Sequence, residues 1–135
     1  MQTNATSDRM RGLFDLTFWE YLDQNEMRLQ CCCACSTYRY PPSAICPDCL
    51  EEAHDWRAVS GRGTVLSWTV FHRQYLPQYP APYNVIAVRL DEGPVLVTNL
   101  LEEDAISTSI GKRVAIVLQK MDDGVCLPRA SILKE

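Results

Sequence analysis

The chain has 135 residues, 47% of them hydrophobic, and a net charge of −4. This length allows one domain or two small ones. The negative charge argues against a protein that binds nucleic acid mainly by neutralising phosphates, because such proteins carry a basic face. No apolar run approaches the ~20 residues that span a bilayer, and the polar residues 1–11 contain no signal-peptide core. We therefore expect a soluble, cytoplasmic protein that does not contact membranes.

A helix is predicted to start near residue 16, after a flexible tail over residues 1–12. Thr17 and Glu20 have the spacing of a capping box, in which each side chain accepts a hydrogen bond from the other residue's backbone N–H. Apolar residues at helical spacing predict one apolar face. These residues are Phe14, Phe18, Tyr21 and Leu22. The face packs either on the chain's own domain or on a partner, and the sequence leaves both open.

Five of the seven cysteines lie between Cys31 and Cys49. Cys32 and Cys35 form one pair and Cys46 and Cys49 another, with the spacing of a four-thiolate zinc ribbon or knuckle. An odd number of cysteines at this spacing favours a metal over disulfides in a reducing cytosol. The ion would be structural, because four protein ligands leave no open coordination position. The alternative is a ribbon that has lost its metal and is held by other contacts.

The remaining cysteines are assigned simpler roles. Cys31 and Cys33 compete with Cys32 for the first ligand position, but only Cys32 leaves two residues before Cys35. We expect Cys31 and Cys33 to be bystanders. Cys126 lies in a predicted strand and is expected to be a small core residue.

From Trp56 onward the sequence predicts strands. The segment 64–72 is rich in β-branched and aromatic residues, and simple alternation places Val65 on the same face as Ser67 and Thr69. A bulge or turn is predicted at Gly61-Arg62-Gly63.

Two hairpins are predicted downstream, around turns at residues 91–94 and 122–124, with a short helical turn near residues 102–109 between them. About five strands in roughly 75 residues suit a small closed barrel of the OB type. The fold class is therefore expected to be mainly β.

No convincing catalytic constellation is present. His54 and His72 are isolated in the sequence, and the carboxylates at 102–104 are interpreted as a solvated face, with an acid–base pair as the alternative. The best candidate surface outside the metal site is the loop Arg73–Tyr83, because tyrosines are favoured interface anchors and prolines reduce the entropy lost on docking. The alternative is that this loop only covers one end of the barrel. The residues assigned to the surface are Phe71, His72, Tyr75, Tyr79 and Tyr83.

A series of short motifs runs through the chain in a specific order. The motifs are Phe18-Trp19, Leu29-Gln30, the two cysteine pairs, Tyr38-Arg39-Tyr40-Pro41-Pro42, Ser60-Gly61-Arg62-Gly63-Thr64-Val65, Pro82-Tyr83, Glu92-Gly93-Pro94, Thr98-Asn99, Ile110-Gly111 and Val114. Together they resemble the acyl-CoA-associated zinc-ribbon/OB-fold family over nearly all of residues 14–133. The resemblance implies an N-terminal helix and rubredoxin-like zinc ribbon over residues 13–55, followed by a five-stranded OB-fold barrel over residues 56–135.

The resemblance also implies a companion subunit that is not catalytic alone. Its partner would be a thiolase-superfamily protein or a hydratase acting on CoA thioesters. A thiolase-like partner would hold the nucleophile and form or cleave a carbon–carbon bond, as in thiolase, acyltransferase or retro-aldolase chemistry. Zn²⁺ would be the structural cofactor and a CoA thioester the shared ligand of the complex. The aromatic surface would then face the partner or the acyl-CoA.

The chain departs from the family pattern at two positions. Ser36 stands where the family usually has glycine after the second cysteine, and Ser43 stands where a basic residue often follows the two prolines. Arg39 is the nearest residue that could replace a basic contact to a CoA phosphate.

Two other functions are alternatives to a companion subunit. OB barrels and zinc ribbons also bind single-stranded nucleic acid through aromatic platforms and basic grooves; the aromatic residues are present here, but the net charge indicates no basic groove. A free-standing enzyme is disfavoured by the missing catalytic constellation.

Overall fold

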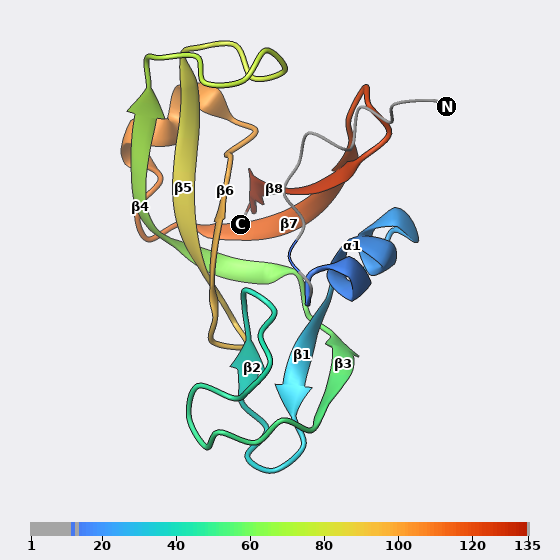
Figure 1. Cartoon of the computed structure of the whole chain (residues 1–135). Helices are drawn as coiled ribbons and strands as arrows, with labels where there is room; N and C mark the ends of the chain where they lie inside the picture. Colours follow the sequence, from blue (N-terminus) through green and yellow to red (C-terminus); the bar gives the residue numbers. More distant parts are fainter. Residues whose placement is uncertain (1–11, 13, 135) are drawn as a thin grey trace, which may run out of the picture. The chain divides into compact units, whose positions relative to one another are not determined.

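The structure is a computed structural model that describes residue 12 and residues 14–134, so most of the predicted tail over residues 1–12 lies outside the described residues. The described part contains one α-helix, one 3-10 helix and two β-sheets (Figure 1). It divides into two compact units: residues up to Val59 with Leu118–Pro128, and Ser60–Val117 with residues from Arg129 onward. Neither helix has the length and hydrophobicity that crossing a membrane requires.

The helix of the first unit, α1 (Leu16–Asp23), buries Phe18 and Leu22. Its N-cap is Asp15, whose carboxylate accepts the Gly12 N–H at 2.9 Å, and no side chain caps the helix. The predicted capping box is therefore wrong, because the helix begins before Thr17 and leaves this residue inside the first turn.

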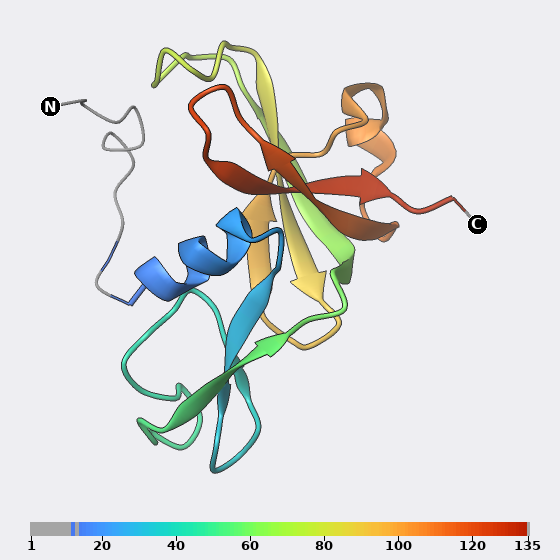
Figure 2. The same cartoon turned by 90° about the vertical axis from the view of Figure 1, so that its right-hand side faces the viewer.

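A three-stranded antiparallel sheet follows α1, with strand order β2-β1-β3 (Figure 2). The central strand β1 (Arg28–Cys32) pairs with β2 (Tyr38–Arg39) on one side and with β3 (His54–Ala58) on the other. Long loops before and after β2 carry the cysteine pairs. Because β3 pairs with β1 along its whole length, it ties the end of the cysteine segment back to its beginning.

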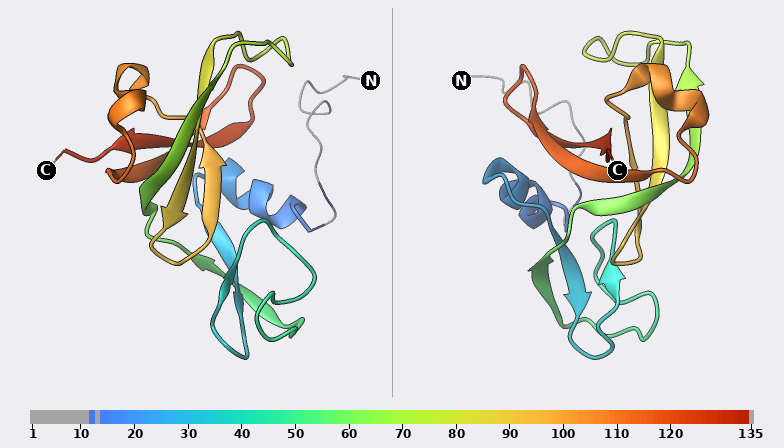
Figure 3. Two further views of the ribbon diagram at one scale, coloured as in Figure 1. Left: turned by 90° about the vertical axis from the view of Figure 1, so that its left-hand side faces the viewer. Right: turned by 180° about the vertical axis from the view of Figure 1, so that it is seen from behind.

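The second sheet has five strands in the order β6-β5-β4-β7-β8 and curls strongly, as the two views of Figure 3 show. The curl brings the two ends of the sheet together, where Leu100 and Ala130 form a single parallel bridge. The strands are β4 (Arg62–Phe71), β5 (Tyr83–Leu90), β6 (Val95–Thr98), β7 (Arg113–Lys120) and β8 (Cys126–Ile132), with the 3-10 helix η2 (Glu103–Thr108) between β6 and β7. This curled half-barrel is typical of an OB fold, and the predicted fold class and both hairpins are confirmed.

The buried core of this sheet is aliphatic, and one bulge decides which residues belong to it. β4 shifts its register against β5 between Val65 and Ser67. The shift puts Val65 and Trp68 on the face of the buried Val88 and Ile86 and turns Ser67 to the other face, and of these residues of β4 only Val65 is buried. Simple alternation therefore wrongly placed Val65 with Ser67, because an extra residue in one strand inverts all faces that follow.

Candidate functional site

The four cysteines predicted as metal ligands meet at one point of the first unit. Their sulfur atoms all lie within 4.8 Å of one another. Cys32 Sγ is 3.5 Å from Cys49 Sγ, and Cys35 Sγ is 3.6 Å from Cys46 Sγ, so each short distance joins sulfurs from different pairs. A tetrahedron with Zn–S bonds of about 2.3 Å separates its sulfurs by about 3.8 Å. The donor type, number and spacing therefore fit one zinc ion.

Two nearly identical turns present these sulfurs. In the first turn the Ser36 N–H donates to the Cys32 carbonyl, and in the second the Leu50 N–H donates to the Cys46 carbonyl, both at 3.0 Å. In each turn the amide two residues after the first cysteine also points at that cysteine's sulfur, at 3.4 Å. Ser36 and Leu50 close the turns with φ of 63° and 66°, in the left-handed region that favours glycine.

The electrostatics of the cluster favour thiolates. Hydrogen bonds from backbone amides, the Cys35 N–H foremost, lower the pKa of Cys32 to about 6, and the Cys49 amide foremost lowers the pKa of Cys46. The Glu51 amide acts to lower the pKa of Cys49, but hydrogen bonding with Cys32 and Cys35, together with burial, outweighs it and raises this pKa to about 12. The four sulfurs thus compete for protons, and a divalent cation would relieve the competition by displacing them.

The three other cysteines lie away from this cluster or point out of it. Cys31 is buried and its thiol donates to the Ser36 carbonyl at 3.4 Å, whereas Cys33 is exposed. Cys126 is buried, lines a pocket of about 310 Å³ beside Leu22, and has its pKa raised chiefly by burial. All seven thiols are free in the structure.

A buried polar network holds the loop between the two cysteine pairs. The Gln30 amide accepts the Ser43 N–H at 2.8 Å and donates to the Ser43 carbonyl at 3.1 Å, as a paired strand residue would. Arg39 Nη2 donates to the Glu51 carbonyl at 2.9 Å, and His54 Nε2 lies 3.2 Å from the Gln30 amide nitrogen. The network therefore connects β1, β2 and β3 with the loop that precedes Cys46.

Arg39 is only 2% exposed within this network. It therefore does not reach solvent, and the expectation that it could replace a basic contact to a CoA phosphate is wrong. The position after the two prolines, Ser43, is likewise engaged through its backbone with Gln30.

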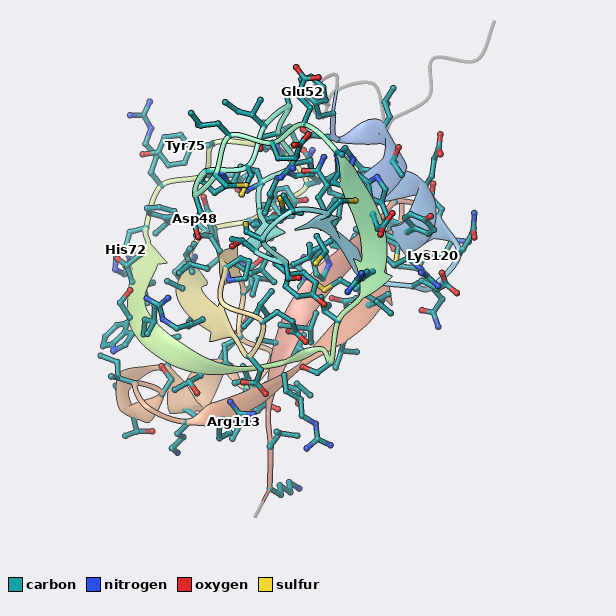
Figure 4. The ribbon with its side chains drawn as sticks, turned by 90° about the horizontal axis from the view of Figure 1, so that it is seen from below. Asp48, Glu52, His72, Tyr75, Arg113 and Lys120 are labelled. Atoms are coloured by element: carbon teal, nitrogen blue, oxygen red, sulfur yellow. The ribbon has the colours of Figure 1, made fainter. Side chains whose placement is uncertain are left out.

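The aromatic surface is partly assembled around the end of β4. The Phe71 ring packs edge-on against Tyr83 and Tyr75, with centroid distances of 5.2 Å and 6.2 Å, and the Arg73 guanidinium lies over the Tyr75 ring at 5.3 Å. His72 and Tyr75 are exposed, and both are labelled in Figure 4. The structure thus gathers Phe71, Tyr75 and Tyr83, places His72 beside them in the chain, and leaves Tyr79 half-buried further along the loop.

Of the three carboxylates at 102–104, Glu102 has a structural role. Burial acts to raise the pKa of Glu102, but the Ser131 hydroxyl at 2.6 Å and the Ile132 N–H at 3.1 Å donate to its carboxylate, and the net effect is a lowered pKa. Glu102 therefore joins the end of β8 to the segment after β6.

Sequence reasoning missed Leu50 as a counterpart of Ser36. Both residues directly follow the second cysteine of a pair and both adopt positive φ. The signal was present in the sequence, because the two cysteine pairs repeat the same spacing and should therefore repeat the same turn.

The features described above define a class of protein in which a four-cysteine ribbon is joined to an OB fold. Family models for "ChsH2, rubredoxin-like zinc ribbon domain" and "ChsH2, C-terminal OB-fold domain" match residues 19–55 and 56–119. A solved structure titled "Ltp2-ChsH2(DUF35) aldolase" matches with a TM-score of 0.80 and 32% identity, covering 92% of this chain and 98% of that chain.

Two curated relatives point the same way. A "DUF35 domain-containing scaffold protein" of Methanothermobacter thermautotrophicus is 30% identical over 70% of this chain and 75% of its own length. A "Probable enoyl-CoA hydratase alpha subunit" of Thermomonospora curvata is 38% identical over 84% of this chain, which spans only 36% of that relative's length. The chain belongs to the ChsH2/DUF35 family of zinc-ribbon and OB-fold proteins, and the resemblance drawn from its motifs is confirmed.

Proposed function

We propose that this chain is a companion subunit that docks onto a thiolase-superfamily enzyme and helps to complete a site acting on a CoA thioester. The reaction would form or cleave a carbon–carbon bond, as a thiolase, acyltransferase or retro-aldolase does. The observation that carries the proposal is the match along nearly the whole chain to a chain of the Ltp2-ChsH2(DUF35) aldolase. The scaffold names of the archaeal relatives support a role without chemistry of its own.

Zinc has a structural part in this proposal. Cys32, Cys35, Cys46 and Cys49 would hold it, and their converging sulfurs support the assignment. When bound, the ion would supply folding free energy to the ribbon and offer no open position for chemistry. We also propose a reducing compartment such as the cytoplasm, because four thiols that converge at metal-ligand spacing are typical of proteins kept reduced there.

The aromatic group at the end of β4 is the proposed contact to the partner or to the acyl-CoA. Tyr75 and Tyr83 both pack on Phe71, so docking would immobilise few additional side chains. His72 and Tyr79 complete this proposed surface from the same segment.

A hydratase companion is the second candidate, because two longer relatives carry hydratase alpha-subunit names. In those relatives the matched region is 36% and 31% of the protein, so their hydratase names describe proteins of which this chain spans about a third. A nucleic-acid-binding module receives no support from the net charge of −4.

Co-expression tests the proposal directly. The chain is produced with a thiolase-superfamily protein of its own organism, and with a hydratase subunit in a parallel preparation. We expect a stable complex with the first protein on size-exclusion chromatography, and cleavage or formation of a carbon–carbon bond in a CoA thioester only when both chains are present. Turnover by this chain alone, or a complex formed only with the hydratase subunit, would contradict the proposal.

A further inference from the structure

Two large apolar side chains flank the second cysteine turn and are exposed. Leu50 directly follows Cys49 and is 68% exposed, and Ile45 directly precedes Cys46 and is 44% exposed. The Leu50 N–H donates to the Cys46 carbonyl at 3.0 Å, so this bond places residue 50 beside the cysteine that follows Ile45. Together Ile45 and Leu50 form what we call the apolar tip of the ribbon.

Leu50 is costly in this position for two independent reasons. Its φ of 66° lies in the left-handed region, where a branched side chain crowds the backbone and glycine does not. Its side chain also remains in water instead of being buried. A bulky residue at positive φ whose side chain is not buried by any described part of the chain points to a contact with another molecule.

The first cysteine turn provides an internal comparison. Ser36 has the same place in its turn and nearly the same φ, 63°, but its side chain is small and polar. The turn geometry therefore does not require an apolar residue. What distinguishes the second turn is the exposed hydrocarbon that Leu50 and Ile45 present.

Three carboxylates lie within a few residues of the apolar tip in the chain, and we call them the acidic rim. Asp48, Glu51 and Glu52 are all exposed, and Figure 4 labels Asp48 and Glu52 among the side chains of the ribbon loops. The Asp48 carboxylate accepts the Thr37 hydroxyl at 3.0 Å and the Glu51 carboxylate accepts the Glu52 and Ala53 N–H groups, so two of the three are fixed in place. This acidic rim repels phosphates and complements a basic protein surface.

We propose that the apolar tip is a docking anchor that inserts Leu50 and Ile45 into an apolar pocket, rimmed by basic residues, on a folded partner protein. The inference rests on the proposed function and takes the thiolase-superfamily subunit as that partner. Bound metal would hold the turn in one conformation before contact, which lowers the entropy lost on binding. A few residues that enter well-packed, desolvated pockets carry most of the binding energy of an interface, and Leu50 would be such a residue here.

Matched glycine substitutions test the anchor in the zinc-loaded full chain. Leu50→Gly removes the side chain and relieves the positive φ, so we expect unchanged zinc content, an unfolding midpoint no lower than that of the original chain, and partner affinity at least about tenfold weaker. Ser36→Gly makes the same backbone change in the other turn and should leave affinity unchanged. The measurements are isothermal titration with the co-purified thiolase-superfamily protein and differential scanning calorimetry of the chain alone.

Each outcome separates the anchor from the wider proposal. Binding by Leu50→Gly within twofold of the original chain would overturn the anchor alone, as would an equal loss of affinity in Ser36→Gly. If Leu50→Gly loses zinc, Ile45→Ser, which leaves the turn intact, decides in its place by the same tenfold criterion. No binding of the thiolase-superfamily protein by the original chain would overturn the proposed function and the anchor with it.

Discussion

The ribbon loops and the curled sheet are stabilised by opposite means. Among residues 33–53, all of them described, Cys46 is the only apolar residue that is buried, and the other buried side chain there is Arg39. The five-stranded sheet instead closes on a continuous aliphatic core, which includes Val65, Ile86, Val88, Leu90, Leu96, Leu100 and Val114. The loops therefore depend on sulfur ligands and buried hydrogen bonds, whereas the sheet depends on packing.

This difference teaches where each region is vulnerable. A region without a hydrophobic core loses its structure when one ligand or one network member is lost, because nothing else compensates. A packed region tolerates the loss of a single polar contact but not a change of volume at a crowded position. Four substitutions separate these behaviours, and they are ordered from the largest expected effect to the smallest.

Cys46→Ser is expected to have the largest effect on structure, and this effect should be limited to the ribbon. Cys46 is buried and is one of the four converging sulfurs, so serine leaves an incomplete ligand set. Structural zinc contributes about 10 kcal/mol or more to folding of small zinc domains, so losing a ligand should disorder the loops. We expect zinc content to fall, and amide signals of residues 33–53 to collapse in ¹H–¹⁵N NMR spectra while those of the sheet persist.

Cys33→Ser is the matched control for the ligand experiment, because Cys33 is exposed and lies outside the converging set. It should retain zinc and a native spectrum. Equal loss of zinc in both variants would show that the assignment of Cys32, and not Cys33, to the first ligand position is wrong.

Gly63→Ala is expected to destabilise the sheet through crowding. A Cβ on Gly63 would lie 2.5 Å from the Arg89 carbonyl oxygen and 2.6 Å from Val88 Cγ1, and the backbone atom cannot yield without separating β4 from β5. We expect a loss of about 3 kcal/mol in the free energy of unfolding, measured by urea titration. Gly111→Ala is the comparison, because its φ is 84° but nothing lies near its Cβ position, and strain alone should cost about 1 kcal/mol.

The hairpins and cysteine pairs could be predicted because their signals are local. Two thiols three residues apart, or a turn such as Asp122-Asp123-Gly124, carry their own geometry in a few adjacent residues. The bulge at Leu66 carries no such signal, since it arises from how β4 meets β5, and it inverted the predicted face of every residue after it. The predicted capping box was wrong for a similar reason, because Asp15 and Thr17 offer equivalent caps to a local pattern.

In the candidate site, the four cysteine ligands could be predicted from the sequence, but the buried hydrogen-bond network that holds their loops could not. Gln30 and Arg39 are hydrophilic, and their burial follows from the pairing of β1 with β2 and β3, which joins partners 7 and 9 positions apart on one side and 22 to 30 positions apart on the other. Only the assembled sheet shows that Arg39 faces inward and donates to backbone carbonyls. The sequence likewise identified the segment that carries the aromatic surface. The packing of Phe71 on Tyr83 could not be predicted, because it depends on the register between β4 and β5.

Gln30→Leu is expected to weaken the ribbon without removing a ligand. The substitution leaves the Ser43 N–H and carbonyl without the partner that the amide provides, at a cost of about 2 kcal/mol. Because the loop leads to Cys46, we expect faster transfer of zinc to a chromogenic chelator. Gln119→Leu, an exposed position on β7, should leave the transfer rate unchanged. Equal rates for Gln30→Leu and the original chain would show that the network does not support the metal site.

Asp91→Asn is expected to have the smallest effect, which becomes visible only in the pH dependence of the free energy of unfolding. Arg113 donates to both Asp91 oxygens, at 2.6 Å and 2.8 Å, and these hydrogen bonds hold the pKa of Asp91 below its ordinary value of 3.8. A lowered pKa in the folded chain means that the carboxylate adds stability above the unfolded-state value, and that this stability disappears as pH falls through the folded-state pKa. The pair is well exposed, so its contribution is screened by solvent.

The pH dependence isolates this contribution from any general effect of the substitution. The free energy of unfolding of the original chain should exceed that of Asp91→Asn at pH 7, and the two should converge as the pH is lowered from 4 toward 2. Asp122→Asn, in the exposed turn between β7 and β8, should follow the original chain throughout. A difference that stayed constant across this range would assign the effect of residue 91 to turn geometry and not to its charge, since only an ionising group can lose its contribution on protonation.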